Sequence, residues 1–250
     1  MSKTKGEKDL HRKITPFLVI ASIVLAFAVG VLWQKVSTLE GDSKSTLSND
    51  EFVDFPNDFE GPTQGKLTQE QTDRIPPVVA GEHIRGPENP SVYLIEYSDY
   101  ECPYCSDFHL TAKRVIEEYP EVAWVYRHFP LDQLHQTARL AAEASECITE
   151  IGGNDAFWAF SDLIYEDQSR VNDLVSLASE VGVDGSSFNS CLESGRYADM
   201  VEDQYQRGID AGVRGTPGNI ILNNKGEAWL VPGAYPFDQI KVMIEEALGI

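Results

Sequence analysis

Two cysteines separated by two residues, Cys102 and Cys105, are the side chains of this sequence best suited to covalent chemistry. A Cys-x-x-Cys pair can form a reversible disulfide, and a thiolate at its first position can attack other disulfides. Residues 92–97, just before the pair, are rich in β-branched and aromatic side chains and predict a buried strand. Residues 108–119, just after it, carry apolar side chains at helical spacing. The pair is therefore expected where a strand passes into a helix.

This position would activate the first cysteine. We expect Cys102 at the N-cap and Pro103 at the first helical position, where the missing proline N–H costs nothing. The free amides of the first turn and the positive end of the helix dipole stabilise a thiolate, which predicts a lowered pKa for Cys102. Tyr104 completes the active-site loop. Cys105, one turn deeper, is expected to be more buried and to resolve the mixed disulfide.

Two other interpretations of the pair are half of a zinc site or an inert structural bridge. Zinc needs two further ligands, and the sequence has no second Cys-x-x-Cys and no close Cys/His pair. His109 lies on the same predicted helix but stands alone. We therefore predict no metal site, and we expect four histidines to be solvated or at the edge of the core: His83, His109, His128 and His135.

The N-terminal residues predict export. Residues 1–13 carry five basic and two acidic side chains, so of the formal net charge of -20 about -23 belongs to the rest of the chain. Residues 14–33 contain no charged residue and as a helix would span about 30 Å, the thickness of a bilayer core. We expect a basic cytoplasmic tail, a transmembrane anchor over 14–33 and a catalytic body outside the cytoplasmic membrane.

The alternative to an anchor is a cleaved signal peptide, because residues 26–28 read Ala-Phe-Ala. Residues 29–33 stay apolar beyond that point, which favours the uncleaved anchor. Both interpretations place the body outside the cytoplasm, where disulfides persist. An acidic body of this kind is repelled by nucleic acid, so nucleic acid is not an expected partner.

The body has an α/β pattern. Residues 34–81 are polar, without a sustained period, and predict a flexible linker, whereas 82–250 are expected to form one domain. A second strand is predicted at 122–129. Residues 132–212 predict an all-helical insertion, with helices at 135–150, 155–166, 172–182 and 197–211. A hairpin over 219–231 and an amphipathic helix over 236–248 close the chain.

The run Glu-Tyr-Ser-Asp-Tyr-Glu-Cys-Pro-Tyr-Cys at 96–105, the helical insertion and Gly-Thr-Pro at 215–217 together resemble the DsbA-like thioredoxin-fold thiol-disulfide oxidoreductases, including the membrane-anchored bacterial ones. The resemblance covers about residues 82–250. It implies a thioredoxin-like fold in which Pro217 is a cis-proline facing the cysteines. It also implies that the backbone of Thr216 pairs with an extended substrate segment. From the sequence alone, an ordinary trans bond before Pro217 would be expected.

Glu96 and the remaining cysteines complete the candidate site residues. Glu96, six residues before Cys102, matches the place where this fold commonly carries a buried acid, and its task would be to move a proton to or from Cys105. If its side chain points to the surface, it has no such role. Cys147 and Cys191, 44 positions apart, predict a structural disulfide between two helices, with a second redox relay as the alternative.

The direction of electron flow is not determined by the dithiol, because the same pair can oxidise, isomerise or reduce. Pro103 and Tyr104 add no positive charge, and Asp99 and Glu101 oppose a nearby thiolate. We hypothesise an oxidase that takes electrons from reduced exported polypeptides and needs no cofactor beyond its own disulfide. The family implies reoxidation by a membrane partner of the DsbB or vitamin K epoxide reductase kind. The alternatives are an isomerase or reductase of the same fold, and a non-enzymatic module that binds extended chains.

Overall fold

The structure is a computed structural model, and it describes residues 65–250. The predicted cytoplasmic tail, the predicted anchor at 14–33 and the predicted linker up to residue 64 lie outside this range. No helix among the described residues is long and apolar enough to cross a membrane.

A six-stranded mixed sheet, in the order β1-β6-β5-β3-β4-β2, forms the centre of the described part. Its strands are β1 (Gly65–Lys66), β2 (His83–Arg85), β3 (Val92–Ser98), β4 (Val122–His128), β5 (Gly218–Asn223) and β6 (Ala228–Pro232). The neighbouring strands β3 and β4 are parallel, and every other neighbouring pair is antiparallel. The parallel pair is joined through helix α3 (Pro103–Glu118), as the strand, helix, strand pattern predicted.

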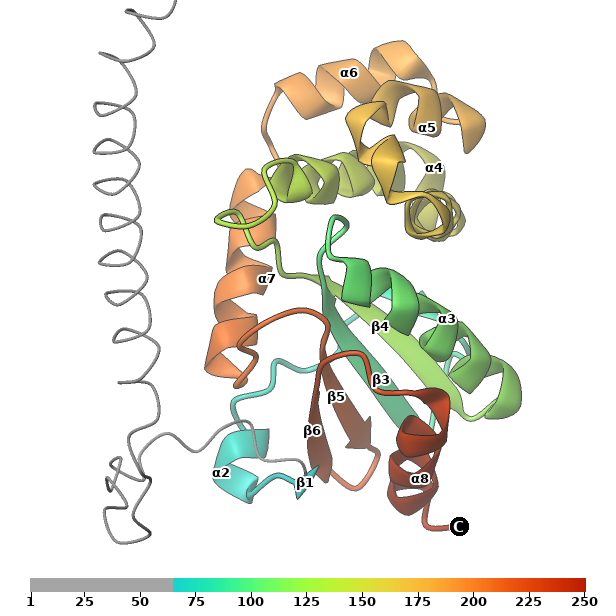
Figure 1. Cartoon of the computed structure of the whole chain (residues 1–250), viewed down its shortest axis with the longest axis vertical. Coiled ribbons are helices and arrows are strands. Elements are labelled where there is room, and N and C mark those ends of the chain that lie inside the picture. Colours follow the sequence, from blue (N-terminus) through green and yellow to red (C-terminus); the bar gives the residue numbers. More distant parts are fainter. Residues whose placement is uncertain (1–64) are drawn as a thin grey trace, which may run out of the picture. The chain divides into compact units, whose positions relative to one another are not determined.

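Helices cover both faces of the sheet (Figure 1). Helices α3 and α8 (Phe237–Leu248) pack on one face, and α7 (Ala198–Asp210) packs against β4 on the other. The side chains of β3 alternate between these faces, because successive residues of a strand point in opposite directions. Leu94 joins the core beneath α3, whereas Ile95 and Tyr97 join the core on the opposite side. The side chains of β3 that point in the same direction as Leu94, at the even-numbered positions, therefore lie below the Cys-x-x-Cys helix.

The predicted insertion is helical, and in the sequence it follows β4 and precedes β5 (Figure 1). It consists of α4 (Ala138–Glu166), the short 3-10 helix η2 (Gln168–Asn172), α5 (Leu174–Glu180), α6 (Gly185–Glu193) and α7. The helices predicted at 135–150 and 155–166 are the two parts of α4, which are separated at Gly153, where φ is 80° and ψ is -176°, outside the helical region. Helix α6 was not predicted, because its first turn reads Gly-Ser-Ser. It forms because Asp184 caps it by accepting from the Ser187 N–H, and because Phe188 is buried.

The predicted flexible linker, 34–81, is wrong for residues 65–81, which are part of the folded unit. Strand β1 pairs with β6, Thr68 caps the short helix α2 (Gln69–Thr72), and Ile75 is buried. Arg127 lies within β4 and is buried. Its guanidinium donates to the carbonyls of Pro76 and Pro77 at 3.1 and 3.2 Å. The segment is thus ordered by contacts with distant strands and not by its own composition.

Candidate active site

The Cys-x-x-Cys pair lies at the start of α3 as predicted, with Cys102 at the N-cap and Pro103 inside the first turn. Cys102 is 4% exposed and Cys105 is fully buried, and the two sulfurs are not bonded to each other. Tyr104 between them is 64% exposed. Ser106, which follows Cys105, donates its hydroxyl to the Tyr165 carbonyl at the end of α4. Only the first sulfur therefore reaches the surface, beside an exposed aromatic ring.

The two thiols are electrostatically unlike. A hydrogen bond from the Cys105 thiol lowers the pKa of Cys102 from 9.0 to about 6, helped by contacts with Thr216 and with the backbone amides of Tyr104 and Cys105, against the effect of partial burial. Burial raises the pKa of Cys105 well above its ordinary value, and the nearby charge of Glu96 raises it further. Helix-terminal amides contribute as predicted, but the largest cause is the partner thiol, which composition cannot show.

Asp99 and Glu101, which we expected to oppose the thiolate, are engaged in holding the loop. Asp99 is buried and accepts hydrogen bonds at 2.8 Å from the amides of Glu101 and Leu131 and from Nδ1 of His135. Glu101 accepts a hydrogen bond from the Thr137 amide at 2.6 Å. These acids fix the segment before Cys102 to the loop after β4, and His135 faces the Asp99 carboxylate.

Glu96 points below the dithiol and is fully buried, on the face that α3 covers. Its two carboxylate oxygens accept from the Ser98 hydroxyl at 2.6 Å and from the Trp124 indole N–H at 3.0 Å. Burial raises the pKa of Glu96 from 4.5 to about 7, and these two hydrogen bonds only partly offset that rise. The carboxyl can therefore gain and lose a proton near neutral pH, which is the property that a proton shuttle needs.

The loop before β5 faces Cys102 from the other side. The peptide bond between Thr216 and Pro217 is cis, the isomer that the resemblance implied. The Thr216 carbonyl accepts from the Cys102 thiol at 3.4 Å. Beside this loop lies a mainly apolar hollow lined by the 212–218 segment, Leu230 and Pro232. An extended polypeptide could reach Cys102 along this surface, with its backbone next to Thr216.

The helical insertion contributes directly to the active-site loop, which the sequence did not indicate. Gln168, in η2, donates its side-chain amide to the carbonyls of Tyr100 and Cys102 at 2.9 and 2.8 Å. Tyr165, at the end of α4, places its hydroxyl 2.8 Å from that of Ser98. No local pattern marks these residues, because their roles depend on where the insertion folds back.

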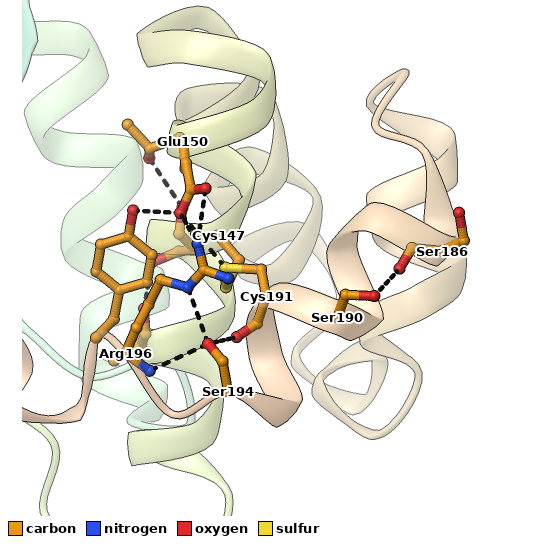
Figure 2. The surroundings of a disulfide bond; sticks show 11 residues. Cys147, Glu150, Ser186, Ser190, Cys191, Ser194 and Arg196 are labelled. Carbon is orange, nitrogen blue, oxygen red and sulfur yellow. Dashed lines mark hydrogen bonds and ion pairs between the residues drawn. A yellow bond between two sulfur atoms is a disulfide. The ribbon is translucent and has the colours of Figure 1, made fainter.

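The remaining cysteines form a disulfide between α4 and α6, with the Cα atoms of Cys147 and Cys191 5.8 Å apart (Figure 2). Next to it, Glu150 accepts from the Arg196 guanidinium at 3.0 Å and from the Tyr197 hydroxyl at 2.7 Å (Figure 2). Both sulfurs lie in the insertion, away from the Cys-x-x-Cys pair in the fold. This arrangement is that of a bridge holding α6 against α4.

Three histidines are more buried than we expected. His83, His109 and His128 are each no more than 2% exposed, so the prediction of solvated or core-edge positions is wrong for them. His109 bonds to Asp162 at 2.6 Å. These rings can be buried because carboxylates on α4, Glu146 and Asp162, form hydrogen bonds with them. A single sequence does not show these distant contacts.

Among the described residues, His83, His128 and Glu146 converge closely enough to be considered as metal ligands. Both imidazoles lie at hydrogen-bond distance from the same Glu146 oxygen, 2.8 and 3.0 Å, and their Nδ1 atoms have no partner that would orient them as ligands. Burial lowers the pKa of His128, and hydrogen bonds from both rings, against burial, lower that of Glu146 to about 2. The trio is therefore assigned to structure: it ties α4 to β2 and β4.

The sheet order and the dithiol at the start of α3 define a thioredoxin-fold protein with a helical insertion. The family model described as thioredoxin matches residues 79–232, more than half of the chain, and the chain belongs to this family. Two solved structures with the same fold are DsbA2 from Pseudomonas aeruginosa and BdbD from Bacillus subtilis. The first has a TM-score of 0.60 and 24% identity, covering 68% of this chain and 96% of that one. The second has a TM-score of 0.58 and 20% identity, covering 76% and 99%.

A curated relative is Na(+)/H(+) antiporter NhaA 3 from Salinispora tropica, 35% identical over 138 residues. The match covers 54% of this chain and 21% of that protein. The chain thus spans about a fifth of the length of this relative. The shared segment is a part of a larger protein there.

Proposed function

We propose that this chain is an extracytoplasmic thiol-disulfide oxidase that introduces disulfides into reduced exported polypeptides. The observation that carries the proposal is the contrast between its two thiols. With a pKa of about 6, roughly nine tenths of Cys102 is thiolate at pH 7, against a few per cent for an ordinary cysteine. A stabilised thiolate favours the reduced form of the enzyme, and therefore makes its disulfide the more oxidising.

The proposed reaction moves two electrons from the client to the enzyme. A client thiolate attacks Sγ of Cys102 in the oxidised pair, the bond between Cys102 and Cys105 breaks, and Cys105 leaves as a thiolate that takes up a proton. A second client thiolate then attacks the client sulfur of the mixed disulfide. The client disulfide forms and Cys102 is expelled as a stabilised thiolate. Reoxidation requires a disulfide-bearing acceptor, which we propose is a membrane partner of the DsbB or vitamin K epoxide reductase type.

The proposed location is the outer face of the cytoplasmic membrane, with residues 14–33 as the anchor. The uncharged length of this segment and its basic flank support the proposal. The relative named as an antiporter adds support, because an antiporter works in a membrane and contains a segment similar to this chain.

The direct test is oxidative refolding of reduced ribonuclease A by the oxidised full-length chain in detergent. We expect one client disulfide to form per enzyme disulfide consumed. The readouts are the loss of client thiols and the recovery of ribonuclease activity. The variant Cys102→Ser should be inactive. In the reduced enzyme, alkylation of Cys102 should have a pH midpoint of about 6, and a midpoint near that of an ordinary thiol would contradict the proposal.

The alternatives give different outcomes in the same experiments. A reductase would have a reduction potential near that of thioredoxin, about -270 mV, and would not drive net oxidation. An isomerase would reactivate scrambled ribonuclease without consuming thiols. A non-enzymatic binding module would bind the unfolded client equally well after Cys102→Ser and would leave its thiols unchanged.

A further inference from the structure

One side chain of the helical insertion restrains the backbone of the reactive cysteine. Gln168, in η2, donates its side-chain amide to the carbonyl of Tyr100 at 2.9 Å and to the carbonyl of Cys102 at 2.8 Å. The NH₂ group of a glutamine has two N–H donors, so both bonds can form at once. The backbone torsion angles of Glu101 and Cys102 lie between these two carbonyls. A single amide group therefore restrains the conformation of both residues.

The conformation of Cys102 decides where its sulfur points. Cys102 is the N-cap of α3, with φ -73° and ψ 119°, so it is extended while the residues after it are helical. In this conformation an N-cap side chain points toward the free amides of the first turn. The Cys102 carbonyl also accepts from the Cys105 amide at 3.0 Å. Rotation about ψ of Cys102 would break this bond and the bond from Gln168, and it would turn the sulfur away from the amides.

The direction of the sulfur matters for the thiolate. The Cys105 thiol, Thr216 and the amides of Cys105 and Tyr104 together lower the pKa of Cys102 to about 6, against the effect of partial burial. Hydrogen bonds weaken steeply when the angle at the donor departs from linear. A side chain that keeps the Cys102 backbone in place therefore keeps these stabilising contacts aligned.

Both ends of α4 contact the start of α3. At the first end, the amide of Thr137, the N-cap of α4, donates to the Glu101 carboxylate at 2.6 Å. At the other end, the Tyr165 carbonyl accepts from the Ser106 hydroxyl at 2.7 Å, and Gln168 follows shortly after. Among these contacts, that of Gln168 reaches the backbone of the reactive cysteine itself.

The restraint matters most in the reduced protein. In the oxidised protein a bond between Cys102 and Cys105 closes a ring, which restrains the loop by itself. In the reduced protein the two sulfurs are not bonded, and hydrogen bonds keep the loop in place. A contact that orders the reduced site more than the oxidised site favours the reduced form, and thereby makes the disulfide more oxidising.

We propose that Gln168 is a positioning residue, which holds Cys102 in its N-cap conformation and thereby makes the disulfide of this protein more oxidising. The inference rests on the proposed thiol-disulfide exchange and adds to it a residue from the insertion. Gln168 acts through the backbone of Cys102 and takes up no proton or electron during the exchange.

The test replaces Gln168 by methionine, which has a similar length but no N–H, in the reduced full-length chain in detergent. We expect the pH midpoint of Cys102 alkylation to rise from about 6 to about 7, a change the size of one net hydrogen bond. The reduced enzyme then loses part of its stabilisation by ionisation at pH 7. The equilibrium with glutathione should therefore shift about fivefold toward the oxidised enzyme.

A second substitution, Gln168→Ala, also removes the donor and leaves space instead of an apolar side chain. It should raise the alkylation midpoint in the same direction. Gln168 is only half-buried, so both variants are expected to fold, and near-ultraviolet circular dichroism checks that they do. Loss of stability alone would lower the urea midpoint and leave the alkylation midpoint of the folded protein at its wild-type value.

The matched control is Asn172→Leu, which removes a side-chain amide of the same 3-10 helix that donates to the Ser169 carbonyl at 2.9 Å. It should keep the alkylation midpoint and the glutathione equilibrium of wild type. An unchanged alkylation midpoint in the Gln168 variants would overturn the proposal, and so would an equal rise in Asn172→Leu. A midpoint near that of an ordinary thiol in wild type would instead contradict the exchange function itself.

Discussion

Replacing Glu96 by glutamine should stabilise the reduced protein while impairing its chemistry. The glutamine amide fits the site without a lost hydrogen bond. Its oxygen can accept from the Trp124 indole, and its NH₂ can donate to Ser98, whose hydroxyl accepts as readily as it donates. The substitution therefore removes the buried charge and keeps the volume and the hydrogen bonds. The difference in stability between wild type and Glu96→Gln is therefore the free energy of ionising a carboxyl in the core.

The size of the gain follows from the pKa of Glu96, which is about 7 in the fold and 4.5 in its absence. The folded state holds the proton more tightly than the unfolded state, so the free energy of unfolding of wild type falls as pH rises through this window. At 1.36 kcal/mol per pKa unit the loss is about 3 kcal/mol at pH 7. Glu96→Gln escapes this loss, which corresponds to a rise of roughly 6–12 °C in Tm for a domain of this size.

The assay is urea unfolding of the reduced protein at pH 4, 6, 7 and 8, for wild type and Glu96→Gln. The two free energies of unfolding should differ little at pH 4 and should separate by about 3 kcal/mol at pH 7. The control is Glu117→Gln, because Glu117 lies on the exposed side of α3. The reasoning is refuted if Glu96→Gln shows the same difference at pH 4 as at pH 8, or no gain at all.

Two further predictions concern packing and cross-linking. Gly208→Ala should destabilise the fold by about 1–3 kcal/mol, because a Cβ at this position of α7 would lie 2.8 Å from two aromatic rings, whereas Gly185→Ala, with its nearest neighbour at 3.6 Å, should not. Urea midpoints measure both. Replacing Cys147 and Cys191 together by serine opens a loop of 44 residues and should cost about 4 kcal/mol. Client oxidation at a temperature where the variant is folded should persist, and its loss there would favour the redox-relay alternative.

Strands β3 and β4 and helix α3 could be predicted because their signals are local. The β-branched run of β3 and the apolar spacing of α3 lie within short windows, and Pro103 marks the helix start. Strands β1 and β2 could not be predicted, because segments of two and three residues are too short to show a hydrophobic period. They form because they pair with β6 and β4. Helix α6 was missed because its cap and its buried Phe188 outweigh a poor first turn.

The site was predictable to the extent that it lies within one segment. Residues 96–105 place the dithiol and the acid on adjacent elements, but whether Glu96 faces the helix or the solvent depends on which side of β3 α3 packs against. The contacts of Tyr165 and Gln168 depend on 60 or more residues of intervening chain. A pattern confined to neighbours in the sequence has no access to them.

Both borders of the sheet consist of very short strands, two residues in β1 and three in β2. A long bare border would offer a row of unpaired amides and carbonyls to any extended polypeptide. For the function proposed here, that would mean capture of unfolded clients far from any sulfur. Because both edges of the described sheet are short, we expect a client of the proposed enzyme to align along the Thr216 backbone beside Cys102, where binding and reaction would take place together.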